Sequence, residues 1–164
     1  MIKIDFLAER ENSVYRLSYD LGNSVPVLKW DTGAKYTVIS AGMLDDNISP
    51  ENIERLKSYC EEHSHYKENF ISASGDPIKG YLVTAHDVRM GNALLRDFHY
   101  YLVVENKIDI ALLGYDFIDC CKRSADAHGD ILISEFDDIG YAIPDGAMEN
   151  DELISFIDSL SEDV

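Results

Sequence analysis

The chain has 164 residues, 46% of them hydrophobic, which is enough to build the core of one domain. Its 31 Asp and Glu outnumber its 14 Lys and Arg and give a formal net charge of −17. Phosphate backbones and anionic membrane surfaces repel so acidic a chain, so we expect neither nucleic acid nor a membrane as a partner.

The start of the chain and its cysteines predict a cytoplasmic protein. The first ten residues lack the basic stretch and apolar run of a signal peptide, and no apolar stretch approaches the roughly 20 residues that span a bilayer. The three cysteines, Cys60, Cys120 and Cys121, are odd in number and two are adjacent. Because this is no disulfide framework, we expect a reducing compartment.

Strand patterns fill the first forty residues. Apolar and polar residues alternate over residues 2–6, and residues 13–19 are also strand-like. After a turn over residues 20–24, the run 25–30 predicts a strand that delivers Asp31 to its end. Residues 37–39 resume as strand.

Two helices are predicted further on. Ser49 offers a capping hydroxyl and Pro50 suits the first helical position, so we expect a helix over about 49–62. The second helix lies in an acidic C-terminal extension, residues 136–164. Its apolar residues recur at helical spacing: Leu153, Ile154, Ile157 and Leu160.

Between these helices the pattern is again that of strands. A hairpin is predicted over about 70–85, with Gly75 in the turn at its tip. Further strands follow over residues 88–104, and the continuous apolar run 110–114 predicts a short buried strand. A helix is expected next, because Phe117, Ile118 and Cys121 have helical spacing, and residues 131–133 return to strand.

The group Asp31-Thr32-Gly33-Ala34 has a chemical logic. A carboxylate that leaves the end of a strand can point into a cleft, a neighbouring hydroxyl can hydrogen-bond inward, and glycine permits a tight turn. Two such carboxylates close together share one proton. The ionised member then takes a proton from water while the protonated member polarises a carbonyl group.

With these residues the sequence resembles the retropepsin-like aspartic proteases, of a bacterial or phage type. Residues 25–34 match the active-site strand and loop, residues 72–80 sit where the family has its flap, and residues 111–114 match its apolar-apolar-Gly element. The resemblance covers residues 1–135. It implies a mainly β, single-domain, closed and barrel-like fold with a flap hairpin, to which the helix at 49–62 and the C-terminal helical extension are added.

The resemblance also implies roles for individual residues. Asp31 would be catalytic, Thr32 would hold the paired aspartates across a dimer axis, and Gly33 would offer its carbonyl to substrate, with Ala34 completing the loop. The remaining implied positions are Ser74 and Gly75 at the flap tip, with Leu113 and Gly114 beneath the active-site loop. Because the chain has a single Asp-Thr-Gly, the second aspartate would come from another copy, so we expect a homodimer that hydrolyses a peptide or protein substrate without cofactor or metal.

Some features depart from the family or allow other interpretations. Tyr115 stands where retroviral members have Arg, and the insertion over 41–70 is longer than theirs. A catalytically silent fold that serves dimerisation or peptide binding is the alternative. Two cysteine and histidine groups fit no standard zinc spacing, and no local context supports a cysteine nucleophile. They are Cys60, His63 and His65, and Cys120, Cys121 and His128. Trp30 is expected in the core.

Overall fold

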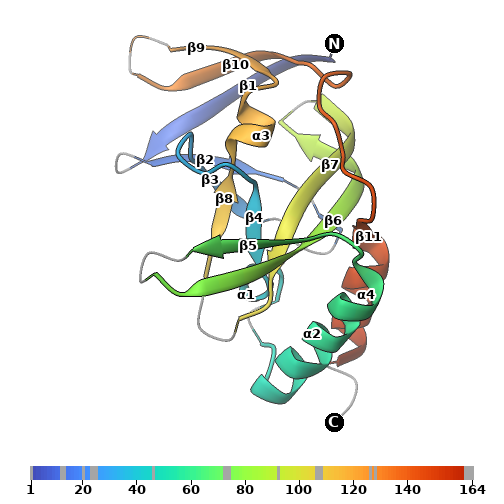
Figure 1. Cartoon of the computed structure of the whole chain (residues 1–164). Helices are drawn as coiled ribbons and strands as arrows, with labels where there is room; N and C mark the ends of the chain where they lie inside the picture. The colour runs from blue at the N-terminus through green and yellow to red at the C-terminus, as the bar shows by residue number, and fades with distance from the viewer. Residues whose placement is uncertain are drawn as a thin grey trace.

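A computed structural model of the protein describes residues 2–11, 14–19, 21–22, 26–45, 47–71, 75–91, 93–105, 109–125, 127 and 129–160. In these ranges the strands are β1 (Ile2–Glu11), β2 (Val14–Ser18), β3 (Val27–Trp30), β4 (Val38–Ser40), β5 (Lys67–Ile71), β6 (Pro77–Met90), β7 (Ala93–Val103), β8 (Ala111–Leu113), β9 (Cys121–Ala125), β10 (Ile131–Phe136) and β11 (Met148–Glu149). The helices are α1 (Ala41–Leu44), α2 (Pro50–His63), α3 (Tyr115–Ile118) and α4 (Asn150–Leu160). The predicted mainly β class is confirmed (Figure 1).

The described strands form one mixed sheet. Hydrogen-bonded neighbours follow the order β11-β6-β7-β4-β8-β3-β2-β1-β10-β9, and β5 adds to β6. At the centre, β8 lies between β3, with which it pairs in parallel, and β4, with which it pairs antiparallel. Because β3 and β8 are parallel, Trp30 and Leu113 are paired at their carboxyl ends. The loops that follow these two strands therefore meet.

The predicted hairpin is present with shifted bounds. β5 and β6 pair antiparallel, with Phe70 opposite Ile78 and Ile71 opposite Pro77. The first strand begins at Lys67 and is described to Ile71, and residues 72–74 lie outside the described ranges. The second strand continues past residue 85 to Met90, because it pairs along its length with β7.

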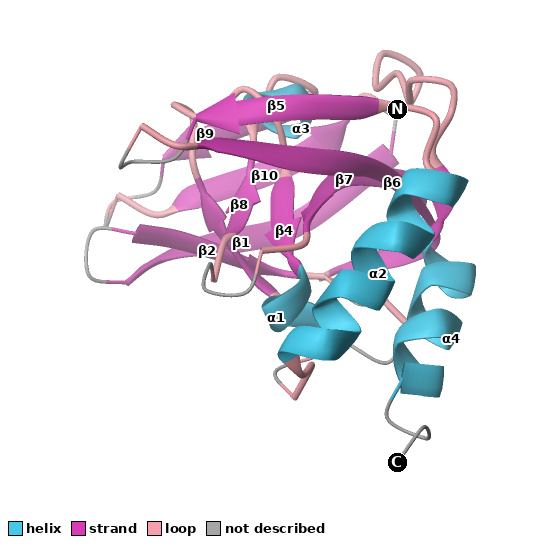
Figure 2. Ribbon diagram, turned by 60° about the horizontal axis from the view of Figure 1, so that its bottom comes forward, coloured by secondary structure: helices cyan, strands magenta, loops and turns pink. Residues whose placement is uncertain are grey.

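The two longer helices, α2 and α4, cover one end of the molecule (Figures 1 and 2). Ser49 caps α2 by accepting a hydrogen bond from the Asn52 N–H at 3.2 Å, as the sequence predicts. Figure 2 shows α2 and α4 together at this end, and the rings of Tyr59 and Phe156 stack between them at 4.2 Å. The predicted apolar face of α4 is buried. No helix in the described ranges is both long enough and apolar enough to cross a bilayer.

The segment after residue 135 packs into the same core as the strands. β11 pairs in parallel with β6, and Phe136 and Tyr141 belong to the main apolar cluster. The domain division at residue 135 stays a prediction, but the two parts share their packing.

The helix predicted after the run 110–114 is present as α3, but its predicted extension to Cys121 is wrong. Residues 117–121 have helical spacing, yet α3 ends at Ile118 and Cys121 begins β9. The antiparallel pairing of β9 with β10 overrides the local pattern, because it satisfies the backbone polar groups of residues 121–125 in a sheet. The short helix α1 was not predicted. Trp30 is buried, as expected.

Candidate active site

Asp31 follows directly after β3, and its backbone N–H donates to the carbonyl oxygen of Leu113 at 3.1 Å. The chain then turns, since the Ala34 N–H donates to the Asp31 carbonyl oxygen at 3.2 Å. The Gly33 N–H donates to Asp31 Oδ1 at 2.9 Å. These bonds fix the carboxylate at the end of the sheet, where Asp31 is half-buried and both Thr32 and Gly33 are exposed.

The turn between β8 and α3 supports this loop from below. The Tyr115 N–H donates to the Ala34 carbonyl oxygen at 2.7 Å, and the Asp116 N–H donates to that of Lys35 at 3.2 Å. Gly114 is buried against the loop: a Cβ on it would overlap the carbonyl group of Tyr36 and lie 2.6 Å from the Thr37 nitrogen. A side chain at position 114 would therefore push the loop away from β8.

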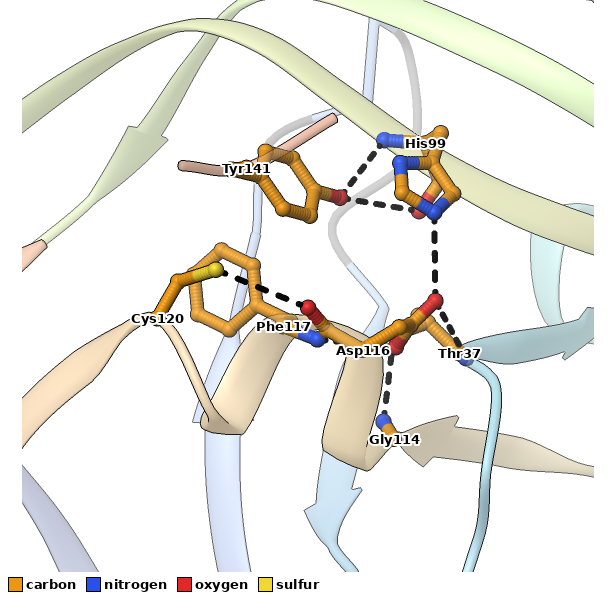
Figure 3. A network of polar contacts seen from close by, with 7 residues as sticks. All are labelled: Thr37, His99, Gly114, Asp116, Phe117, Cys120 and Tyr141. Carbon is orange, nitrogen blue, oxygen red and sulfur yellow. Dashed lines mark hydrogen bonds and ion pairs between the residues drawn. The ribbon is translucent and has the colours of Figure 1, made fainter. Parts of the chain in front are cut away.

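Asp116 joins the loop to this turn through its carboxylate. Oδ1 accepts from the Thr37 hydroxyl at 2.9 Å, and Oδ2 accepts from the Thr37 N–H at 3.3 Å. The Thr37 hydroxyl oxygen in turn accepts from the Gly114 N–H at 3.1 Å. The residues just before β4 and just after β8 are thus tied, directly or through the Thr37 hydroxyl, to one largely buried carboxylate (Figure 3).

Two aromatic side chains complete the network. His99 Nε2 lies 3.1 Å from Asp116 Oδ2, and the imidazole stacks on the ring of Tyr141 at 4.8 Å. The Tyr141 hydroxyl accepts from the backbone N–H of His99 at 3.0 Å. Figure 3 shows the imidazole between Tyr141 and Asp116. Sequence reasoning missed Thr37, His99, Asp116 and Tyr141 as a site. A histidine in the otherwise apolar run 98–104 was the available signal.

The hairpin of β5 and β6, which is predicted to be the flap, has an exposed glycine near its tip. Gly75 is exposed and has a φ of +87°, and no atom of the described residues lies within 4 Å of the position that its Cβ would take. Ser74, the other predicted tip residue, lies outside the described residues. The tip end of the hairpin lies away from α2 and α4 (Figures 1 and 2).

Charged groups hold the base of the hairpin. Glu61 on α2 lies 2.6 Å from Lys67 Nζ and 2.9 Å from Lys79 Nζ, and it accepts from the Tyr81 hydroxyl at 2.6 Å. Hydrogen bonds from Lys67, Tyr81 and Lys79 lower the pKa of the Glu61 carboxyl to about 2. This carboxylate therefore stays ionised well below the ordinary pKa of a glutamate.

A depression of about 350 Å³ lies against β3 and β8. Val27 and Lys29 line it, and because side chains alternate along a strand, Asp31 follows on the same face of the sheet. The other lining residues are Met43, Asp109, Ile110, Ala111 and Leu112. The depression thus combines apolar walls with one cation and one carboxylate.

The cysteine and histidine groups do not form a comparable site. Burial raises the pKa of both the Cys60 and Cys121 thiols to about 12, so these thiols are protonated and poor nucleophiles. His63 and His65 are exposed, whereas Cys60 is buried, and His128 lies outside the described ranges. Among the described residues, no three His, Cys, Asp or Glu side chains gather closely enough to hold a metal ion.

Comparison with known proteins supports the fold. The chain is similar to the crystal structure of a retropepsin-like aspartic protease from Rickettsia conorii, with a TM-score of 0.50 and 19% sequence identity, over 77% of this chain and 94% of that one. No protein-family model matches the chain, and no curated protein matches it. The retropepsin-like fold is therefore confirmed, and what the site does has to be argued from its residues.

Proposed function

We propose that the protein is an aspartic endopeptidase of the retropepsin-like type, with Asp31 as its catalytic residue. One observation carries the proposal: Asp31 leaves the end of β3 beside β8, with its carboxylate half-exposed and fixed by the Gly33 N–H. The loop below it is held by main-chain bonds and a buried carboxylate. A reacting group positioned by rigid elements is what hydrolysis by an activated water requires.

The second aspartate would come from another copy of the chain. The sequence contains a single Asp-Thr-Gly, so a carboxylate pair needs two protomers related by a twofold axis. Thr32 and Gly33 are exposed beside Asp31, which leaves them free to contact such a partner. The two Asp31 carboxylates would share a proton and titrate as one unit.

In this mechanism the ionised Asp31 takes a proton from water, and the protonated Asp31 of the partner subunit polarises the scissile carbonyl. An extended peptide would lie beneath the flaps and bind through backbone hydrogen bonds, with one side chain in the depression beside Lys29. The three thiols are free, which fits the cytoplasmic location expected from composition. The helical insertion and the C-terminal segment favour a bacterial or phage-type relative over a viral polyprotein processor.

The experiment is Asp31→Asn with peptide cleavage read by mass spectrometry and oligomeric state read by analytical ultracentrifugation. We expect cleavage to fall by on the order of 10³-fold or more while the dimer persists. Asp119→Asn, at an exposed carboxylate on the turn after α3, is the matched control and should cleave as the wild type does. A dimeric wild type without cleavage would instead favour the silent, peptide-binding alternative.

A further inference from the structure

His99 is a buried polar side chain with a single hydrogen-bonding partner for its ring. It lies on β7, is 4% exposed, and its Nε2 is 3.1 Å from Asp116 Oδ2. Its other ring nitrogen, Nδ1, is buried and has no hydrogen-bond partner among the described residues. An unpaired buried nitrogen costs free energy that an apolar side chain here would avoid. What the imidazole contributes is therefore the bond to Asp116.

We propose that His99 and Tyr141 are positioning residues of the active site. They hold the Asp116 carboxylate in the orientation that fixes the loop 31–37, which carries Asp31. The effect on catalysis rests on the proposed peptidase function, whereas the effect on loop order does not. Tyr141 gives the segment after residue 135 a direct part in the site.

The arrangement of donors around Asp116 supports this. The other donors come from Thr37, at the end of the loop, and from the backbone of Phe117, in the turn that begins α3. Asp116 lies in that same turn. Among the described residues, His99 is the donor that reaches this carboxylate from a separate element, the long strand β7. His99 thereby ties the carboxylate to β7, which the donors from the loop and from the α3 turn do not do.

Tyr141 in turn fixes the imidazole. Its ring lies parallel to that of His99 within 15°, and its hydroxyl bonds both the backbone N–H of His99 at 3.0 Å and the backbone carbonyl at 3.4 Å. Burial raises the pKa of Tyr141 well above its ordinary value, so the phenol keeps the proton that it donates. The rings of Phe117 and Phe136 pack on its other sides.

The test asks whether the hydrogen-bond donor of His99 is needed, or only the volume of its side chain. His99→Gln keeps an N–H donor at about the reach of Nε2, whereas His99→Leu removes the donor but keeps an apolar side chain. We expect His99→Leu to lower kcat by about tenfold with KM changed by less than about twofold, and His99→Gln to keep most of kcat. His86→Leu, at an exposed imidazole on the neighbouring strand, is the control and should keep kcat.

A second measurement is independent of catalysis. Amide hydrogen exchange at Ala34, Thr37 and Gly114 should become faster in His99→Leu and stay near the wild-type rate in His99→Gln. Should His99→Leu not fold, Tyr141→Phe gives the same comparison with a smaller change in the same direction. Unchanged exchange at these amides, or equal impairment of the Gln and Leu variants, would overturn the inference. A wild type that cleaves no peptide would refute the proposed function, and the exchange rates would still decide the role of His99.

Discussion

The loop 31–37, which carries Asp31, and the hairpin of β5 and β6 are held by different kinds of contact. Below Asp31 the contacts are buried: Gly114 packs against the main chain of the loop, and the Asp116 carboxylate is surrounded by donors. At the hairpin the contacts are exposed ion pairs from Glu61 to the base, while no described residue approaches the Cβ position of Gly75 at the tip within 4 Å. Buried hydrogen bonds fix a group closely, whereas exposed ion pairs contribute little and allow movement.

This difference suits the two parts to different tasks. In the proposed dimer, a carboxylate that meets its twin across the axis needs a loop with one conformation, and the hydrogen bonds around Asp116 favour one. In the same proposal, a hairpin that admits a peptide has to open and close, and the ion pairs of Glu61 hold it at its base. The same substitution placed in the two regions should therefore have very different effects.

The largest contrast is expected between Gly114→Ala and Gly75→Ala. A Cβ at position 114 overlaps the main chain of the loop, and we expect the free energy of unfolding to fall by at least about 3 kcal/mol. At position 75 the added Cβ meets no atom in the described part of the chain, and the positive φ alone costs roughly 1 kcal/mol. Urea unfolding of both variants measures the difference. Equal losses would show that the loop gives way as easily as the flap tip.

The next effect is expected from Asp116→Asn. Donors from Thr37, Phe117 and His99 converge on the two carboxylate oxygens, and an amide must turn its own donor toward at least one of them. We expect a loss of about 2 kcal/mol in the free energy of unfolding, with faster hydrogen exchange at Thr37. Asp119→Asn, three residues on and exposed, should leave both quantities unchanged. A loss shared by the two variants would assign the effect to net charge rather than to the network.

The sequence predicts the exposed part of the site better than the buried part. Asp31, Gly33 and Gly75 follow from local turn chemistry, and the strand before Asp31 follows from an apolar run, because these signals lie within a few consecutive residues. The network of Thr37, His99, Asp116 and Tyr141 joins four segments. The pairing of β4, β7 and β8 brings the first three together, and Tyr141 joins them by stacking on the imidazole. Residue 121 shows the same limit, since its helical spacing yields to pairing with β10.

A smaller effect is expected at the base of the flap, from Glu61→Gln. Because the pKa of Glu61 is lowered in the folded protein, its ion pairs stabilise above about pH 4.5 and lose this contribution as the pH falls through about 2. Glu61 is exposed, so we expect a difference from wild type of less than about 1 kcal/mol at neutral pH, vanishing toward pH 2. Thermal melts across this range measure it. Glu62→Gln, at the adjacent exposed carboxylate, is the control, and a pH-independent difference would count against the ion-pair explanation.

The smallest effect is expected where the C-terminal segment meets the sheet on its exposed side. His86 lies 2.7 Å from Asp97 on β7 and 2.7 Å from Glu149 on β11, and its hydrogen bond to Asp97, followed by that to Glu149, raises the pKa of the imidazole. The contribution is therefore present below about pH 6.5 and is lost as the pH rises through the higher folded-state pKa. His86→Gln should remove a few tenths of a kcal/mol at pH 6 and nothing at pH 9.

His86→Gln also allows a comparison of the two contacts that hold the C-terminal segment to the sheet. Tyr141 is buried against His99, whereas Glu149 is held by an imidazole that is 47% exposed. If burial is what couples the segment to the active-site loop, His86→Gln should leave hydrogen exchange at Thr37 unchanged while Tyr141→Phe accelerates it. Faster exchange in both variants would mean that the segment acts on the loop as one rigid unit, through β11 and β6 as much as through the buried tyrosine.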